Sequence, residues 1–126
     1  MYAIDDNDVL VIAQKIVSKS ENRYVDLEKV KISDEAKKLS LELNKDERLV
    51  QLIMNESNKI ISTNKNVIIV EHKLGFININ AGIDLSNISQ TKNQVLLLPE
   101  NPSKSAKKIQ ENLSKMLNKN ISLIIT

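Results

Sequence analysis

Residues 67–87 have the sequence VIIVEHKLGFININAGIDLSN, and this stretch contains the pattern that decides the fold. Two apolar runs, Val67–Val70 and Phe76–Ile79, are separated by a short segment that ends in Lys73-Leu74-Gly75. A third run, Lys59–Thr63, precedes them after a few polar residues. Runs of this length with short polar connections are typical of antiparallel hairpins. The region therefore predicts a β-rich part of the fold.

The only two glycines of the chain, Gly75 and Gly82, both fall within this stretch. Glycine adopts a positive φ without a steric penalty and lets a ligand approach the backbone closely. Directly after Gly82 come a carboxylate, a hydroxyl and a carboxamide, on Asp84, Ser86 and Asn87. Because loops commonly carry binding and catalytic residues, this segment is the first candidate for a functional site.

Outward from this stretch, Ser33, Asp46 and Asn101-Pro102 have the properties of helix starts. An apolar stripe is expected on the last helix, at Ala106, Ile109, Leu113, Met116 and Leu117. Strands are predicted near 9–17, 59–63, 67–72, 76–80, 95–98 and 121–125, and helices near 34–43, 46–57 and 102–117.

These elements predict one mixed α/β (α+β) domain over residues 1–126, with a β-sheet of antiparallel hairpins packed by about three helices. A Rossmann fold is not predicted, because no glycine-rich turn follows the first strand.

Composition excludes several classes of function. The net charge is +2 and aromatic residues make up 2% of the chain, which argues against a nucleic-acid partner. The chain has no cysteine, so it contains neither disulfides nor a thiolate metal site. No apolar stretch approaches the roughly 18 residues of a membrane span. We expect a cytoplasmic protein without a membrane partner.

In order and spacing, several stretches resemble the coenzyme F-420:L-glutamate ligase (gamma-glutamyl ligase) family. The specific part is Asn80-Ala81-Gly82-Ile83-Asp84-Leu85-Ser86-Asn87, within the matching segment 75–87. The other matching stretches are 8–19, 46–50, 56–57 and 96–102.

The resemblance implies an enzyme that uses GTP and Mg²⁺ or Mn²⁺ to join L-glutamate to the terminal carboxylate of a deazaflavin coenzyme precursor, through an acyl phosphate. By position, Asp84 matches the metal-binding aspartate of the family and Asn87 a nucleotide-contacting asparagine. Gln14, Lys15 and Lys19 match a nucleotide-contacting stretch. The resemblance also implies a homodimer.

Each candidate residue has a structural alternative. Asp84 could instead cap the turn after Gly82 through backbone amides, and Asn87 could simply end that turn. Lys19 could be a solvated surface lysine, and the single histidine, His72, is expected to be structural or solvated and not a general base. The lysines between residues 104 and 119 are expected on the solvated face of a helix.

The family pattern includes a further N-terminal segment and a large C-terminal portion that do not occur in these 126 residues. We therefore expect a truncated chain that is inactive by itself as a ligase. The alternative function is a non-catalytic nucleotide-binding or assembly module with the same fold.

Overall fold

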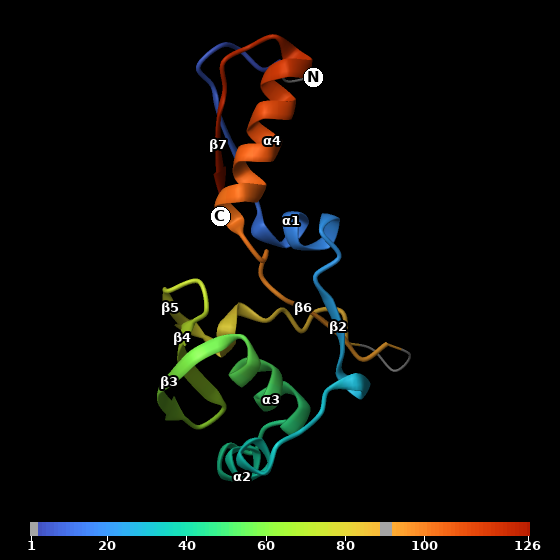
Figure 1. The fold of residues 1–126 in the computed structure, drawn as a ribbon, viewed down its shortest axis with the longest axis vertical. Coiled ribbons are helices and arrows are strands. Elements are labelled where there is room, and N and C mark those ends of the chain that lie inside the picture. The colour runs from blue at the N-terminus through green and yellow to red at the C-terminus, as the bar shows by residue number, and fades with distance from the viewer. Residues whose placement is uncertain (1–2, 89–91) are drawn as a thin grey trace. The chain divides into compact units, whose positions relative to one another are not determined.

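The computed structural model describes residues 3–88 and 92–126, and the chain divides into two compact units (Figure 1). Unit 1 comprises Met1–Arg23 and Leu98–Thr126, and unit 2 comprises Tyr24–Leu97. The described residues form four α-helices and three small sheets, two antiparallel and one parallel. The predicted mixed α/β class is confirmed, although with one more helix than the sequence indicated.

Unit 1 is built on a parallel pair of strands. β1 (Val9–Ile12) and β7 (Ser122–Ile125) pair in register, with Val9 opposite Ser122 and Ile12 opposite Ile125. The helix α4 (Pro102–Leu117) lies along β7, as Figure 1 shows. The short helix α1 (Gln14–Ser20) follows β1 directly.

The predicted strand over 9–17 is wrong beyond Ile12, because α1 begins at Gln14. The backbone N–H of Gln14 donates to the carbonyl of Thr126 at 2.7 Å, which ends the parallel ladder. The helix α1 then buries the adjacent residues Val17 and Ser18 together. Packing thus overrides the β propensity of the branched residues in this segment.

The start of α4 is confirmed: Asn101 caps it, with its Oδ1 accepting from the N–H of Lys104 at 3.0 Å, and Pro102 occupies the first turn. The predicted apolar stripe is wrong at its end, since Met116 is 80% exposed and Leu117 is also exposed. The described residues of unit 1 leave this last turn of α4 uncovered.

Unit 2 contains the predicted antiparallel hairpins. β3 (Ser57–Asn64), β4 (Val67–His72) and β5 (Ile77–Ile79) form one sheet in that order. Along β4 the side chains alternate between buried and half-buried, so one face of this sheet is turned to the core.

Two capped helices cover that face. Ser33 Oγ accepts from the N–H of Ala36 at the start of α2 (Asp34–Leu43). Asp46 Oδ1 accepts from the N–H of Arg48 at the start of α3 (Glu47–Asn55). The larger core cluster joins these helices to β4 and consists of Ala36, Leu43, Leu49, Val50, Ile53, Ile68, Val70 and Ala81.

A second, smaller cluster lies beside the antiparallel pair of β2 (Tyr24–Asp26) and β6 (Gln94–Leu96). It includes Leu27, from the short 3₁₀ helix η1 (Leu27–Lys29), together with Leu52, Val95 and Leu97. Ile83 packs against both clusters. The segment that follows Gly82 is thus anchored at its base to the core of unit 2.

Candidate functional site

The glycine-containing segment of unit 2 begins with a left-handed turn. Asn80, Ala81 and Gly82 form the 3₁₀ element η2 (Asn80–Gly82), with φ values of +51°, +55° and +67°. Only Gly82 adopts this region without steric cost, so Ala81, which is buried, stores strain of about 1 kcal/mol. Asn80 holds the turn in place, since its Oδ1 accepts from the N–H of Ile68 on β4 at 2.9 Å.

Asp84 is fixed by both its backbone and its side chain. Its N–H donates to the carbonyl of Leu96 at 2.9 Å, and its carbonyl accepts from the N–H of Leu96 at 3.0 Å. Its Oδ1 accepts from the N–H of Ser86 at 2.8 Å, which is an Asx-turn. The half-buried carboxylate is therefore held in one orientation, and its turn-capping role coexists with any role toward a ligand.

Asn87 ends this turn in a half-buried position. Its Nδ2 is buried and has no hydrogen-bond partner among the residues that the structure describes. A buried amide donor left unsatisfied costs roughly 1–3 kcal/mol, and such groups call for an explanation in native structures. An acceptor supplied by a ligand would satisfy the Asn87 donor.

The resemblance implies a bound Mg²⁺ or Mn²⁺, which needs several oxygen ligands. A carboxylate oxygen is the right ligand type for Mg²⁺ or Mn²⁺. However, residues 3–88 and 92–126 contain no group of three or more His, Asp or Glu side chains able to hold an ion. Asp84 would supply one ligand, which does not make a complete site.

The other three predicted residues lie in unit 1, on α1. Gln14, Lys15 and Lys19 are all exposed. Lys15 and Lys19 are four residues apart in a helix, so they share one face. The predicted residues thus form two groups, one on α1 and one on the segment after Gly82, each within its own unit.

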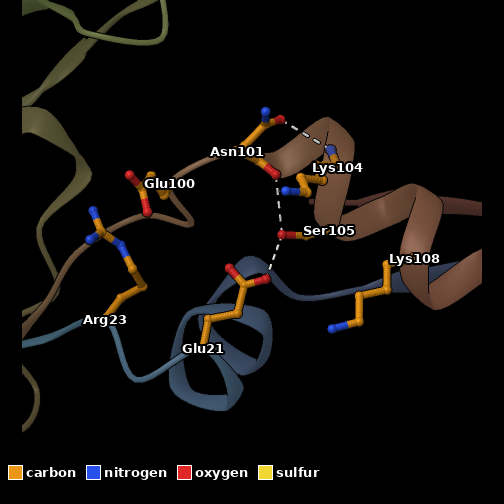
Figure 2. A pocket seen from close by; sticks show the side chains of 7 residues that line it. All are labelled: Glu21, Arg23, Glu100, Asn101, Lys104, Ser105 and Lys108. Atoms are coloured by element: carbon orange, nitrogen blue, oxygen red, sulfur yellow. Dashed lines mark hydrogen bonds between the residues drawn. The ribbon is translucent and has the colours of Figure 1, made fainter.

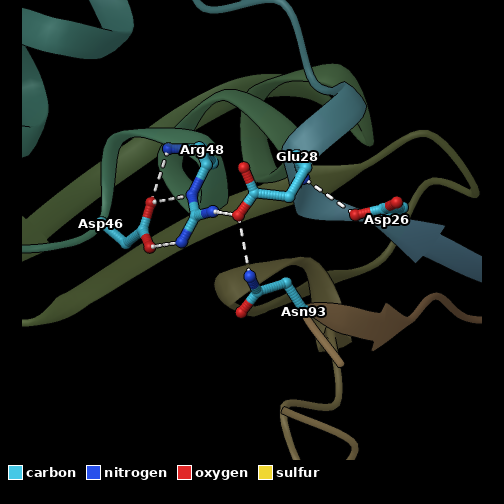
Figure 3. Close-up of polar contacts among 5 residues, drawn as sticks. All are labelled: Asp26, Glu28, Asp46, Arg48 and Asn93. Atoms are coloured by element: carbon cyan, nitrogen blue, oxygen red, sulfur yellow. Dashed lines mark hydrogen bonds and ion pairs between the residues drawn. The ribbon is translucent and has the colours of Figure 1, made fainter. Parts of the chain in front are cut away.

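An ion-pair network in unit 2 was not predicted (Figure 3). Arg48 binds both Asp46, at 2.8 Å, and Glu28, at 2.5 Å, and Glu28 also accepts from Asn93 Nδ2 at 2.7 Å. The side-chain hydrogen bond from Arg48 is the main cause that lowers the pKa of Asp46, and the same bond raises the pKa of Arg48. This network connects η1, the start of α3 and the residue before β6.

Of the two roles expected for His72, structural or solvated, the structure shows the structural one. It is 3% exposed and its ring stacks on Phe76 with centroids 5.1 Å apart. Its Nδ1 accepts from the N–H of Leu74 at 3.0 Å, which fixes the turn between β4 and β5.

Sequence reasoning missed a cleft in unit 1, shown in Figure 2. Glu21, Arg23, Lys104 and Lys108 are among the side chains that line it. Lys104, Lys107 and Lys108 are all exposed, as predicted for the solvated face of α4, and Lys104 and Lys108 also line the cleft. The available signal was the spacing of Lys104 and Lys108, which places two like charges on the same helix face.

Comparison with known proteins identifies the family of this chain. The sequence model of the family described as F420-0:Gamma-glutamyl ligase matches residues 1–126, and the chain belongs to this family. The resemblance drawn from the sequence is thereby confirmed.

Curated relatives agree with this assignment. A coenzyme F420:L-glutamate ligase of Methanocaldococcus jannaschii is 39% identical over 125 residues, covering 99% of this chain and 49% of the relative. Those of Methanococcus maripaludis and Methanothermobacter thermautotrophicus are 40% and 38% identical, covering 98% and 96% of this chain and 49% and 47% of the relatives. The chain spans about half the length of the curated relatives it matches.

Within the described residues, none of the helices has both the length and the apolar character that crossing a bilayer requires.

Proposed function

We propose that this chain forms part of a ligase that joins L-glutamate to the terminal carboxylate of a deazaflavin coenzyme precursor with consumption of GTP. The observation that carries this proposal is the family match along residues 1–126, which includes the strained Asn80–Gly82 turn and the fixed Asp84. The curated relatives carry the name of this reaction.

The proposed chemistry has two steps. The precursor carboxylate attacks the γ-phosphorus of GTP and releases GDP, giving an acyl phosphate. The glutamate amine then attacks the acyl carbon, inorganic phosphate leaves, and the amine loses a proton, so that an amide remains. Phosphoryl transfer depends mainly on positioning and on neutralising charge.

Residues of this chain suit parts of that task. Lys15 and Lys19, on one face of α1, would neutralise phosphate oxygens, and Gln14 would hydrogen-bond the nucleotide. The buried Nδ2 of Asn87 would donate to a nucleotide acceptor. Asp84 would contribute one ligand to Mg²⁺ or Mn²⁺, with the remaining ligands coming from outside the described residues.

The experiment uses a chimera in which these 126 residues replace the aligned 49% of the Methanocaldococcus jannaschii ligase. We expect it to attach glutamate to the coenzyme precursor with GTP and Mg²⁺ or Mn²⁺, as detected by mass spectrometry. Asp84→Asn keeps the size and the turn-forming amide and removes the charge, and it should lower the rate by at least about a hundredfold.

Asp26 provides a matched control for Asp84, because its Oδ1 caps a similar turn by accepting from the N–H of Glu28 at 3.0 Å. Asp26→Asn should leave the rate within about twofold of the parent chimera. Equal rates for the Asp84 variant and the parent would make Asp84 a turn residue only. A chimera that folds and binds GTP but forms no glutamyl product would reject the ligase proposal.

The alternative is a non-catalytic nucleotide-binding or assembly module. It is favoured by the groups directed at a nucleotide, since the Nδ2 of Asn87 and the ammonium groups of Lys15 and Lys19 would bind one without taking part in a reaction. Isothermal titration of the chain with GTP separates the two: GTP binding, together with a chimera that forms no product, would support the module.

We further propose a homodimer in the cytoplasm, on the basis of the family resemblance. Analytical ultracentrifugation of the purified chain and of the chimera gives the test of assembly. A monomer in both samples at micromolar concentration would reject the dimer.

A further inference from the structure

The cleft in unit 1 has a volume of about 560 Å³ and lies between the end of α1 and the start of α4 (Figure 2). Its charged side chains come from both segments: Glu21 and Arg23 from the first, and Glu100, Lys104 and Lys108 from the second. Three of these groups are cationic and two are anionic. A cleft of this size holds a small metabolite with room to spare.

The two lysines of the cleft are close to each other on one face of α4. Lys104 and Lys108 are four residues apart on α4, so their like charges destabilise the helix. Neither forms an ion pair or hydrogen bond through its ammonium group within the described part of the chain. In contrast, the exposed Lys107 lies 3.9 Å from Glu111 on the same helix. An anion in the cleft would offset the repulsion between Lys104 and Lys108.

The anionic wall of the cleft is preorganised. The hydroxyl of Ser105, a residue only 7% exposed, donates to Glu21 Oε2 at 2.5 Å, and Figure 2 shows this bond at the centre of the cleft. Charge-assisted bonds of this length are strong and orient the carboxylate. Arg23 is held similarly, since its Nε donates to the carbonyl of Leu98 at 2.8 Å.

Because the cleft carries both positive and negative side chains, it favours a ligand that also carries charges of both signs. An inorganic phosphate or a nucleotide would bring only negative charge against Glu21 and Glu100, at a cost in repulsion. An amino dicarboxylate carries two carboxylates and one ammonium group. The carboxylates would face the lysines and Arg23, and the ammonium would face the fixed carboxylate of Glu21. Charges of both signs are then paired.

We propose that this cleft binds an amino dicarboxylate, and specifically L-glutamate as the amine substrate. The choice of L-glutamate rests on the proposed function, whereas the ligand class rests on the charges of the cleft. Glu21 and the two lysines bind the substrate and set its orientation.

Binding is tested on the 126-residue chain by NMR, following amide shifts during titration with L-glutamate. Shifts should concentrate at residues 21–23 and 100–108, and Lys108→Ala should weaken binding at least about fivefold. Lys107→Ala is the matched control and should leave affinity unchanged. Amide spectra of each variant confirm that it folds. No saturable shifts with L-glutamate, or equal weakening by both lysine variants, would overturn the proposal.

Glutarate, which lacks the amine, tests the role of Glu21. Glu21→Gln should weaken L-glutamate binding but leave glutarate binding unchanged or stronger, because only the ammonium needs the carboxylate. Equal effects on both ligands would overturn the assignment of Glu21. Saturable binding of GTP in the cleft in place of L-glutamate would overturn the ligand class.

The chimera separates this inference from the proposed function. With glutamate transfer as the readout, Lys108→Ala should raise the KM for glutamate with kcat within about twofold, as expected for loss of a binding contact. Glutamate transfer by the Lys108 variant with an unchanged KM would contradict glutamate binding in the cleft but would support the ligase function. If the chain binds glutamate in a way that depends on Lys108 but a folded chimera transfers none, the binding site is supported and the ligase function is contradicted.

Discussion

Unit 2 and unit 1 differ in how they use their apolar residues. Both clusters of buried apolar side chains lie in unit 2, where two capped helices cover one face of an antiparallel sheet. In unit 1 the parallel pair β1–β7 exposes one apolar face, with Val9, Val11 and Ile124 each more than half exposed. Parallel strands are normally covered on both faces. Unit 2 thus contains both apolar clusters, whereas unit 1 has an exposed apolar face and a charged cleft.

The outer face of the sheet in unit 2 also exposes apolar side chains. Ile77 and Ile79, on the edge strand β5, are 64% and 57% exposed. Ile79 lies opposite Ile69 on β4, so the exposed side chains share one face. The apolar core of unit 2 therefore lies on the sheet face that α2 and α3 cover.

The largest expected effect is in the core of unit 2. Ile53 is 0% exposed and packs in the larger cluster, so Ile53→Ala should lower the free energy of unfolding by about 3 kcal/mol. Urea unfolding followed by circular dichroism provides the measurement. Ile77→Ala is the control and should cost less than about 0.5 kcal/mol. Similar losses in both variants would remove the distinction between the two faces.

The next effect concerns the left-handed turn that carries the candidate site. Asn80→Ala removes the acceptor of the Ile68 N–H, so it should destabilise unit 2 by about 1–2 kcal/mol. Asn80→Asp keeps an acceptor oxygen and should recover most of the loss. Hydrogen exchange of the Ile68 amide reports the bond directly. Unchanged protection in the alanine variant would show that Asn80 does not anchor the turn.

A smaller effect is expected from the Asp46–Arg48 pair. Because Arg48 lowers the pKa of Asp46, the pair stabilises the folded state above the ordinary aspartate value of 3.8. That contribution is lost as pH falls through the lower pKa of the folded state. Asp46→Asn keeps the helix cap, so at pH 5–8 it should cost only about 0.5 kcal/mol. Urea midpoints of the two proteins should converge in acid, and a constant gap would contradict the pairing.

The smallest effect is expected on the exposed face of unit 1. Val11→Thr preserves the β-branched shape and should change stability by less than about 0.5 kcal/mol, since the side chain is 61% exposed. A loss above about 1 kcal/mol, or a change in sedimentation, would show that another surface covers this face in solution. That result would reduce the contrast between the two units.

The sequence by itself determined the family, the mixed α/β class, the hairpins of β3–β5 and the starts of α2, α3 and α4. These features depend on local chemistry: alternating apolar residues, capping side chains, a proline in the first turn, and glycine where φ is positive. The motif from Asn80 to Asn87 belongs to this group only in part. The turn at Asp84 is local, whereas Asn80 is bonded to Ile68 and Asp84 to Leu96, which are distant in sequence.

Tertiary structure alone decided the features that depend on residues distant in sequence. Strand β1 ends at Ile12 and α1 begins at Gln14, although the apolar and β-branched residues continue to Val17. The last turn of α4 is exposed at Met116 and Leu117, although its sequence continues the apolar stripe. The cleft of unit 1 is lined by two segments that are distant in sequence, and the hydrogen bonds from Ser105 to Glu21 and from Arg23 to Leu98 join them.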